Sequence, residues 1–214
     1  DSETSKLIIG NISLNSTAFL DFTDASKPLP LGNPTEGALL LWLNKDKIRY
    51  DKIRNKEEVL DQLPFSTERK FMATLVNSPK LKRKVLYVKG APEVILKNST
   101  QVVAASGFAP VEEYKKTVDD QLLKYQDQAM RTLGFAYKYI DDEKVSIESL
   151  ASSGLTFLGI AGISDPVRAD VPDAVHQCLD AGVGGKIVTG DTYGTAKEIG
   201  RQIGIWNDEI DTDR

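Results

Sequence analysis

The 214-residue chain has little of several features that would assign a protein class at once. Cys178 is its single cysteine, which excludes an internal disulfide and agrees with a reducing compartment. No apolar run approaches the ~18 residues needed to span a bilayer, and the N-terminal residues lack the pattern of a secretory signal. We therefore expect the chain itself to be soluble.

An excess of positive charge is also missing. The formal net charge of −4 offers no global basic field for nucleic acid. The densest basic run, Lys80 to Lys84, lies between two strand-like segments, and we interpret it as a solvated hairpin tip rather than a binding patch. His176 and Cys178 would diverge by about 200° on a helix, which does not suit a shared metal ion. We expect no nucleic-acid partner and no metal site formed by this chain alone.

What is present is typical of a globular protein, with 41% hydrophobic and 27% charged residues, enough for one large domain or two small ones. The first part of the chain alternates strand and helix signals without a regular βαβ order, which favours an α+β fold. The expected helices are Pro34 to Leu43, with Thr35 near its cap, and Val111 to Met130. The expected strands are Phe71 to Val76 and Lys84 to Val88, paired as a hairpin, then Leu133 to Tyr139 and Leu155 to Ile163.

The pattern changes after Ser164. A turn, a helix capped by Asp170, a strand from Lys186 to Thr189 and a second helix ending near Gly204 would form half of a doubly wound α/β unit. We therefore divide the chain into a domain over residues 1–164 and a partial Rossmann-like segment over residues 165–214.

The segment Lys89-Gly90-Ala91-Pro92-Glu93 follows a strand and begins a helix. A lysine at a strand end can place its ammonium on a phosphate, and Gly90 lets a ligand or another chain segment approach the backbone. Pro92 suits the first helical turn. The same residues also suit a simple strand-to-helix turn with an exposed lysine.

Two further motifs allow both a functional and a structural interpretation. In the segment from Phe65 to Met72, Phe65 can stack on a flat base while Lys70 attracts its phosphates, or Phe65 can lie in the core above a charged turn. Thr189-Gly190-Asp191 places a carboxylate beyond the carboxyl end of a strand, where Mg²⁺ can bind, yet Gly and Asp also make good turns.

The order of these motifs resembles the cytoplasmic catalytic part of P-type cation-transporting ATPases. Pro34-Thr35-Glu36 stands before them, and Asp165-Pro166-Val167-Arg168, before the last, looks most like the calcium-pump branch. The resemblance implies a nucleotide-binding domain with an antiparallel sheet flanked by helices, followed by an incomplete Rossmann-like phosphorylation domain. It also implies that the segment faces the cytoplasm within an integral membrane protein.

The resemblance gives individual residues a role. Phe65 would stack on adenine, and Lys89 would lie at the pocket floor near the base, with Gly90 beside it. The other implied residues of the nucleotide pocket are Glu36, Lys70, Met72, Arg131 and Leu133. The implied hinge and phosphorylation-domain residues are Asp165, Arg168, Thr189, Gly190 and Asp191, of which Thr189 and Asp191 would be catalytic.

The chain also departs from the family pattern. Thr67 stands where muscle-type calcium pumps have a basic residue. No Asp-Lys-Thr-Gly-Thr sequence is present, and the aspartate of that motif forms the acyl-phosphate. We expect the segment to hold ATP and, with Mg²⁺ in the intact enzyme, to present its γ-phosphate to that aspartate. Its expected partners are ATP and the membrane, actuator and phosphorylation domains, and alone it would be monomeric and inactive.

Two other functions compete with this hypothesis. A self-contained phosphatase of the haloacid dehalogenase type would use Thr189 and Asp191, but the nucleophile motif is missing. A protein-interaction module without nucleotide binding would make Phe65 and Lys89 merely structural.

Overall fold

The computed structural model describes residues 2–105, 107–141, 145–164, 167–189 and 193–211. These residues form eight helices and nine strands. The helices are α1 (Glu3–Leu14), α2 (Pro34–Lys45), α3 (Tyr50–Arg54), α4 (Pro92–Lys97), α5 (Val111–Asp127), α6 (Ile147–Ala151), α7 (Val171–Asp180) and α8 (Tyr193–Ile203). The strands are β1 (Phe19–Asp21), β2 (Leu29–Leu31), β3 (Glu58–Leu63), β4 (Phe71–Ser78), β5 (Arg83–Gly90), β6 (Ser99–Ala104), β7 (Gly107–Pro110), β8 (Arg131–Ile140) and β9 (Leu155–Ile163).

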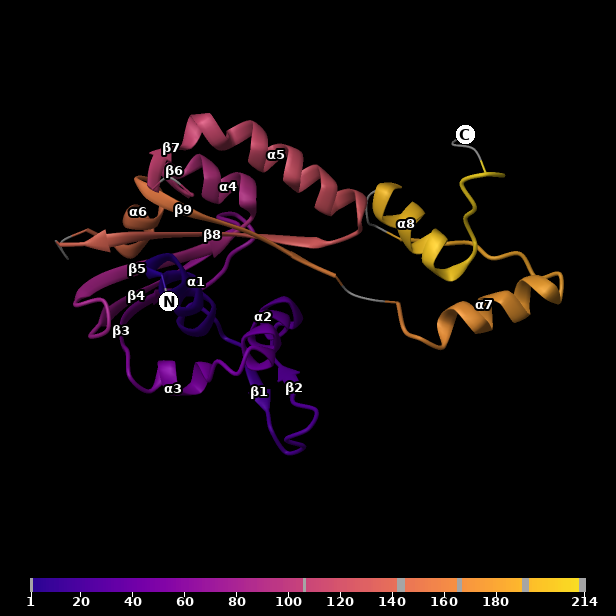
Figure 1. Ribbon diagram of the computed structural model, residues 1–214, viewed down its shortest axis with the longest axis horizontal. Coiled ribbons are helices and arrows are strands. Elements are labelled where there is room, and N and C mark those ends of the chain that lie inside the picture. The colour runs from indigo at the N-terminus through magenta and orange to yellow at the C-terminus, as the bar shows by residue number, and fades with distance from the viewer. Residues whose placement is uncertain (1, 106, 142–144, 165–166, 190–192, 212–214) are drawn as a thin grey trace. The chain divides into compact units, whose positions relative to one another are not determined.

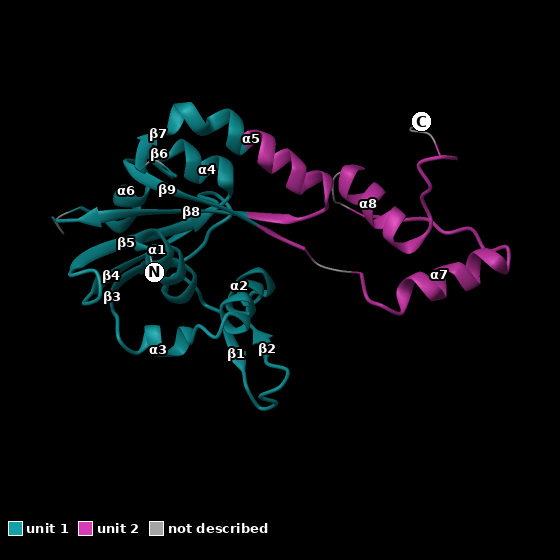
Figure 2. Ribbon diagram, viewed as in Figure 1, with its two compact units in different colours: residues 1–118, 133–161 teal, residues 119–132, 162–214 magenta. Residues whose placement is uncertain are grey.

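The chain separates into two compact units, which Figure 2 colours separately. The first contains residues 1–118 and 133–161, and the second contains residues 119–132 and 162–214. The first unit carries most of the sheet. The second contains helices α7 and α8. The domain boundary expected after residue 164 stays a prediction.

A seven-stranded sheet with the order β3-β4-β5-β8-β9-β6-β7 organises the first unit. The expected hairpin is confirmed, because β4 and β5 pair antiparallel from Phe71 opposite Gly90 to Ser78 opposite Arg83. The sheet is not wholly antiparallel, since β6 and β9 run parallel, so it is a mixed sheet in an α+β fold. Figure 1 shows α4 and the start of α5 on one side of the strands of the first unit and α2 and α3 on the other.

Alternating side chains place the core on both faces of the sheet. Phe71, Ala73 and Leu75 of β4 belong to a buried cluster that also includes residues of α4, α5 and α6. On the other face, α1 packs against β5. The helix lies close to the sheet because Gly10 of α1 leaves room for the Tyr87 side chain: a Cβ at Gly10 would lie 2.4 Å from the Tyr87 hydroxyl oxygen.

Residues 1–30 contain no motif that predicts a role, yet α1 provides a buried polar link to the sheet. Asn11 is fully buried and donates from Nδ2 to the carbonyl oxygens of Val88 and Ala136, each at 3.0 Å. Asn15, also fully buried, donates to Asn11 Oδ1 and accepts from Thr74 Oγ1 at 2.9 Å. These bonds tie α1 to three strands, because buried polar groups need partners.

One local prediction agrees with the structure and one requires correction. Thr35 lies near the cap of α2, as expected, and the N-cap itself is Asn33, whose Oδ1 accepts from the backbone N–H groups of Thr35 and Glu36. Residues Lys186 to Thr189 do not form the expected strand. A strand needs a neighbour for its backbone hydrogen bonds, and none of the described strands pairs with this segment.

The helices expected from Val111 onward are confirmed. α5 ends three residues before Met130, the expected end, and α8 covers the second helix expected in the C-terminal segment. Asp170 is the N-cap of α7, although its side chain makes no capping hydrogen bond. In the part of the chain that the structure describes, no helix is both long enough and apolar enough to cross a bilayer.

Candidate functional site

A buried ion pair lies at the centre of the candidate site. Lys89 Nζ at the end of β5 contacts Glu36 Oε1 in the first turn of α2 at 2.8 Å. Lys89 is 3% and Glu36 is 7% exposed. Among the described residues, no further acceptor takes a hydrogen bond from the Lys89 ammonium. The simple turn with an exposed lysine, allowed by the sequence, is therefore wrong.

The second carboxylate oxygen of Glu36 is held by the loop that follows α1. Glu36 Oε2 accepts from Ser16 Oγ (3.1 Å), Thr17 Oγ1 (3.0 Å) and the backbone N–H groups of Thr17 (2.8 Å) and Ala18 (3.1 Å). Arg54 fixes this loop by donating to the carbonyl oxygens of Ser13 and Ala18. The protein's own groups thus hold the carboxylate in one orientation.

These contacts set the protonation of the pair. Burial raises the pKa of Glu36, but the Lys89 charge and the hydrogen bonds from Lys89 and Thr17 outweigh it, so the pKa lies below its ordinary value. Burial lowers the pKa of Lys89, Glu36 opposes that effect, and the nearby Arg54 adds to it. Burial therefore acts against the charged form of both partners, and the pair depends on mutual contact.

We expect Glu36 to make the stability of the protein depend on acid pH. A carboxyl whose pKa is lower in the folded than in the unfolded state stabilises the fold above the unfolded pKa, and this contribution disappears as pH falls through the folded pKa. Urea unfolding from pH 7 to pH 3 should show the difference between the wild type and Glu36→Gln shrinking below about pH 4.5. A difference that stays constant over this range would contradict the assignment.

Gly90 brings two of the sequence motifs together. A Cβ at this position would lie 2.3 Å from the Lys70 carbonyl oxygen and 2.6 Å from Phe71 Cα. The backbone N–H of Ala91 donates to that same carbonyl at 2.9 Å. Of the two uses expected for Gly90, the structure shows the approach of another chain segment, and Lys70 therefore lies beside the Lys89 strand end.

The residues from Pro64 to Lys70 form a hydrogen-bonded loop. The Lys70 N–H donates to the Ser66 carbonyl at 2.8 Å, and Arg69 donates from its guanidinium to the Pro64 carbonyl. Lys70 has a positive φ of 57° and an exposed side chain 3.9 Å from Glu93. Phe65 is 57% exposed, so the alternative that it belongs to the core is wrong.

The other candidate residues are placed as follows. Met72 is buried in β4 and pairs in register with Lys89. Arg131 is the exposed first residue of β8, and Leu133 is half-buried in the same strand. Arg168 is exposed and lies 3.6 Å from Asp170, and Thr189 is exposed. Asp165, Gly190 and Asp191 lie outside the described residues.

No sequence pattern predicts several residues of the site. Ser16 and Thr17 hold the Glu36 carboxylate, and Arg54 fixes the loop that carries them, but all three come from loop and short-helix segments with no distinctive pattern. The one available signal is compositional, since small hydroxyl residues after a helix often bind nearby polar groups. Their partner cannot be deduced from it, because Glu36 is about twenty residues away along the chain.

The chain matches a protein family described as "P-type ATPase, cytoplasmic domain N" over residues 3–170. It is similar to the calcium-transporting ATPase PAT1 of Dictyostelium discoideum, with 34% identity over 200 residues, which cover 93% of this chain and 18% of that protein. It is also similar to calcium-transporting ATPase 1 of Saccharomyces cerevisiae, with 35% identity over 202 residues, 93% of this chain and 20% of that protein.

A third relative is the probable plasma membrane-type calcium-transporting ATPase 9 of Oryza sativa, 35% identical over 213 residues, 97% of this chain and 20% of that protein. The chain thus spans about a fifth of the length of these relatives.

Proposed function

Because the chain belongs to the family of P-type ATPase cytoplasmic N domains, we propose that it binds ATP for a cation pump, with calcium as the transported ion. The calcium assignment follows the names of its relatives. Residues 1–164 form the proposed nucleotide domain, and residues 165–214 belong to the phosphorylation domain.

The observation that carries the proposal is the buried ammonium of Lys89. An ammonium has three donors, and Glu36 takes the only contact that the described residues offer it. A buried polar group with spare donors favours a ligand that can accept them. The acceptor nitrogens of adenine have this property, and the segment carrying Phe65 and Lys70 lies beside the same strand end.

The proposed pocket holds the base more firmly than the phosphates. Phe65 supplies an exposed aromatic face for stacking, while Lys70 and Arg131 supply exposed cations for the phosphates. Met72 and Leu133 line the base, and Gly90 keeps the backbone close. One stacked base and a few exposed cationic contacts correspond to a dissociation constant of roughly 0.1 to a few mM.

We expect Phe65→Ala to weaken ATP binding by about tenfold, because loss of a stacking partner costs about 1–3 kcal/mol. The measurement is a titration of ATP into ¹⁵N-labelled protein, with and without Mg²⁺. Phe108→Ala is a matched control, since Phe108 is 67% exposed at the far edge of the sheet in β7 and should leave ATP binding unchanged. A folded protein without saturable shifts at about 10 mM ATP would remove the nucleotide site.

A comparison of adenosine with ATP separates contacts to the base from contacts to the phosphates. Phe65→Ala should weaken the binding of adenosine and of ATP by the same factor. Lys70→Gln should weaken the binding of ATP by a few-fold and leave that of adenosine unchanged. The Lys70 effect should fade at high salt, because exposed charges are screened. An equal loss of adenosine binding in Lys70→Gln would place Lys70 elsewhere in the pocket.

In the intact pump, the N domain would present the γ-phosphate of ATP to an aspartate outside this chain. Such a role is one of positioning, in which neutralisation of phosphate charge contributes most of the rate. Mg²⁺ would accompany the phosphates and neutralise their charge. We assign Thr189, Gly190 and Asp191 to the phosphorylation site and Asp165 and Arg168 to the hinge.

A further inference from the structure

A pocket opens in the first unit at the closed end of the β4–β5 hairpin. It has a volume of about 360 Å³ and is lined by residues of α1, α3, the segment after α3, and the hairpin turn. The candidate nucleotide site lies at the other end of the hairpin, where Phe71 pairs with Gly90. A volume of this size is typical of sites for small ligands.

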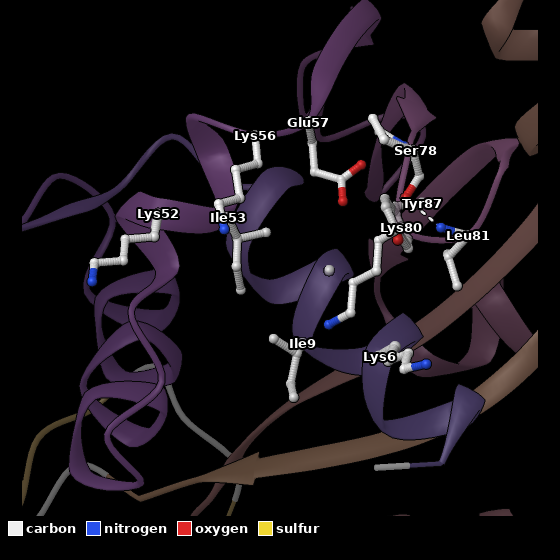
Figure 3. A pocket seen from close by; sticks show the side chains of 12 residues that line it. Lys6, Ile9, Lys52, Ile53, Lys56, Glu57, Ser78, Lys80, Leu81 and Tyr87 are labelled. Carbon is white, nitrogen blue, oxygen red and sulfur yellow. Dashed lines mark hydrogen bonds between the residues drawn. The ribbon is translucent and has the colours of Figure 1, made fainter.

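The walls of the pocket are apolar and its rim is basic. Ile9, Ile53 and Tyr87 form the apolar part. Four lysines line it, Lys6, Lys52, Lys56 and Lys80, and within the described residues none of them makes an ion pair. Figure 3 shows Lys80 reaching from the hairpin turn toward Ile9 and Lys56 beside Ile53, while Lys6 and Lys52 point outward at opposite ends.

Two polar side chains line the interior of the pocket. Tyr87 is 2% exposed, and its ring and hydroxyl lie against the cavity. Burial, and then the Glu57 charge, raise the pKa of Tyr87, so its phenol stays protonated as a donor. Glu57 Oε2 is buried, and no described group donates to it. The free oxygen of Glu57 can accept a hydrogen bond from a ligand, but its charge opposes an anion placed next to it, so only the lysines of the rim favour an anionic group.

We propose that this pocket binds a small organic anion, with an apolar body against Ile9, Ile53 and Tyr87 and a phosphate or carboxylate held by Lys56 and Lys80. Four lysines against one glutamate leave the lining with a net charge of +3. This charge selects an anion, and the apolar walls select one with a hydrocarbon part rather than a bare inorganic ion. The site is independent of the proposed ATP pocket and does not require it.

Alkyl phosphates test the proposal, because they carry both parts of the ligand without an aromatic ring that could stack on Phe65. Hexyl phosphate titrated into the ¹⁵N-labelled chain should shift the amides of Gly10, Ile53 and Leu81 saturably. Its affinity should exceed that of butyl phosphate by about fourfold for each added methylene that the pocket buries. Inorganic phosphate and hexylamine should bind much more weakly.

Charge variants give the second part of the test. Lys56→Gln/Lys80→Gln should weaken hexyl phosphate about five- to tenfold, whereas the matched control Lys115→Gln/Lys116→Gln, on the exposed face of α5, should not change it. Glu57→Gln should tighten binding about threefold by removing a like charge. A merely structural role of these residues would not produce opposite effects.

Four results would overturn the proposal. They are shifts confined to the surroundings of Phe65 and Lys70, equal affinities for butyl and hexyl phosphate, hexylamine binding as tightly as hexyl phosphate, and equal losses in the two double-lysine variants. ATP binding is tested separately, by Phe65→Ala and its Phe108→Ala control.

Discussion

Glu36→Gln is expected to lower the free energy of unfolding by about 3–5 kcal/mol, the largest effect among the substitutions considered. It leaves the ammonium of Lys89, 3% exposed, without its counterion, and an uncompensated buried charge is costly. It also replaces an acceptor of four hydrogen bonds from Ser16, Thr17 and Ala18 by an amide. Urea unfolding at pH 7 measures the loss.

A substitution of the other partner of the ion pair is the control for this prediction. Lys89→Met should cost about half as much, because the Glu36 carboxylate keeps its donors from the loop after α1. The double variant Glu36→Gln/Lys89→Met should regain about 1–2 kcal/mol relative to Glu36→Gln alone. If Glu36→Gln cost less than about 1 kcal/mol, the pair would be exchanging with solvent rather than buried.

Gly90→Ala is expected to destabilise the protein by about 3 kcal/mol. Its Cβ would lie 2.3 Å and 2.6 Å from backbone atoms of Lys70 and Phe71, which cannot turn away as a flexible side chain can. The strand end would have to move, and Lys89 with it. Thermal or urea unfolding measures the stability. We also expect the folded molecules of this variant to bind ATP more weakly than the wild type.

Two other glycines provide a graded comparison. Gly134, which pairs with Gly90, would place its Cβ 2.9 Å from Pro92 Cα, so Gly134→Ala should cost less than Gly90→Ala. Gly184 has no atom within 4 Å of such a Cβ, and Gly184→Ala should change stability by no more than about 0.5 kcal/mol. Equal effects at all three positions would show that loss of glycine, rather than crowding, causes the change.

Short-range pattern predicted much of the first unit. The two strand-like runs Phe71 to Val76 and Lys84 to Val88, joined by a basic turn, predicted the β4–β5 hairpin, and apolar residues at helix-like intervals predicted α5. The parallel pairing of β6 with β9 was not predictable, because it joins segments more than fifty residues apart. The expected strand Lys186 to Thr189 failed for a related reason: a pattern specifies a strand only when a neighbour is there to pair.

The amino-acid sequence by itself determined the family, the α+β class and the identity of the proposed nucleotide residues, because these follow from motifs that are contiguous in the chain. Tertiary structure alone decided what those residues contact. In the folded protein Lys89 is buried against Glu36, Phe65 is exposed, and the segment from Lys70 to Phe71 lies against Gly90. Lysines from three separate segments line the pocket that contains Tyr87. Such contacts join residues far apart in the chain, so no local pattern encodes them; burial and hydrogen bonding in the folded protein select them.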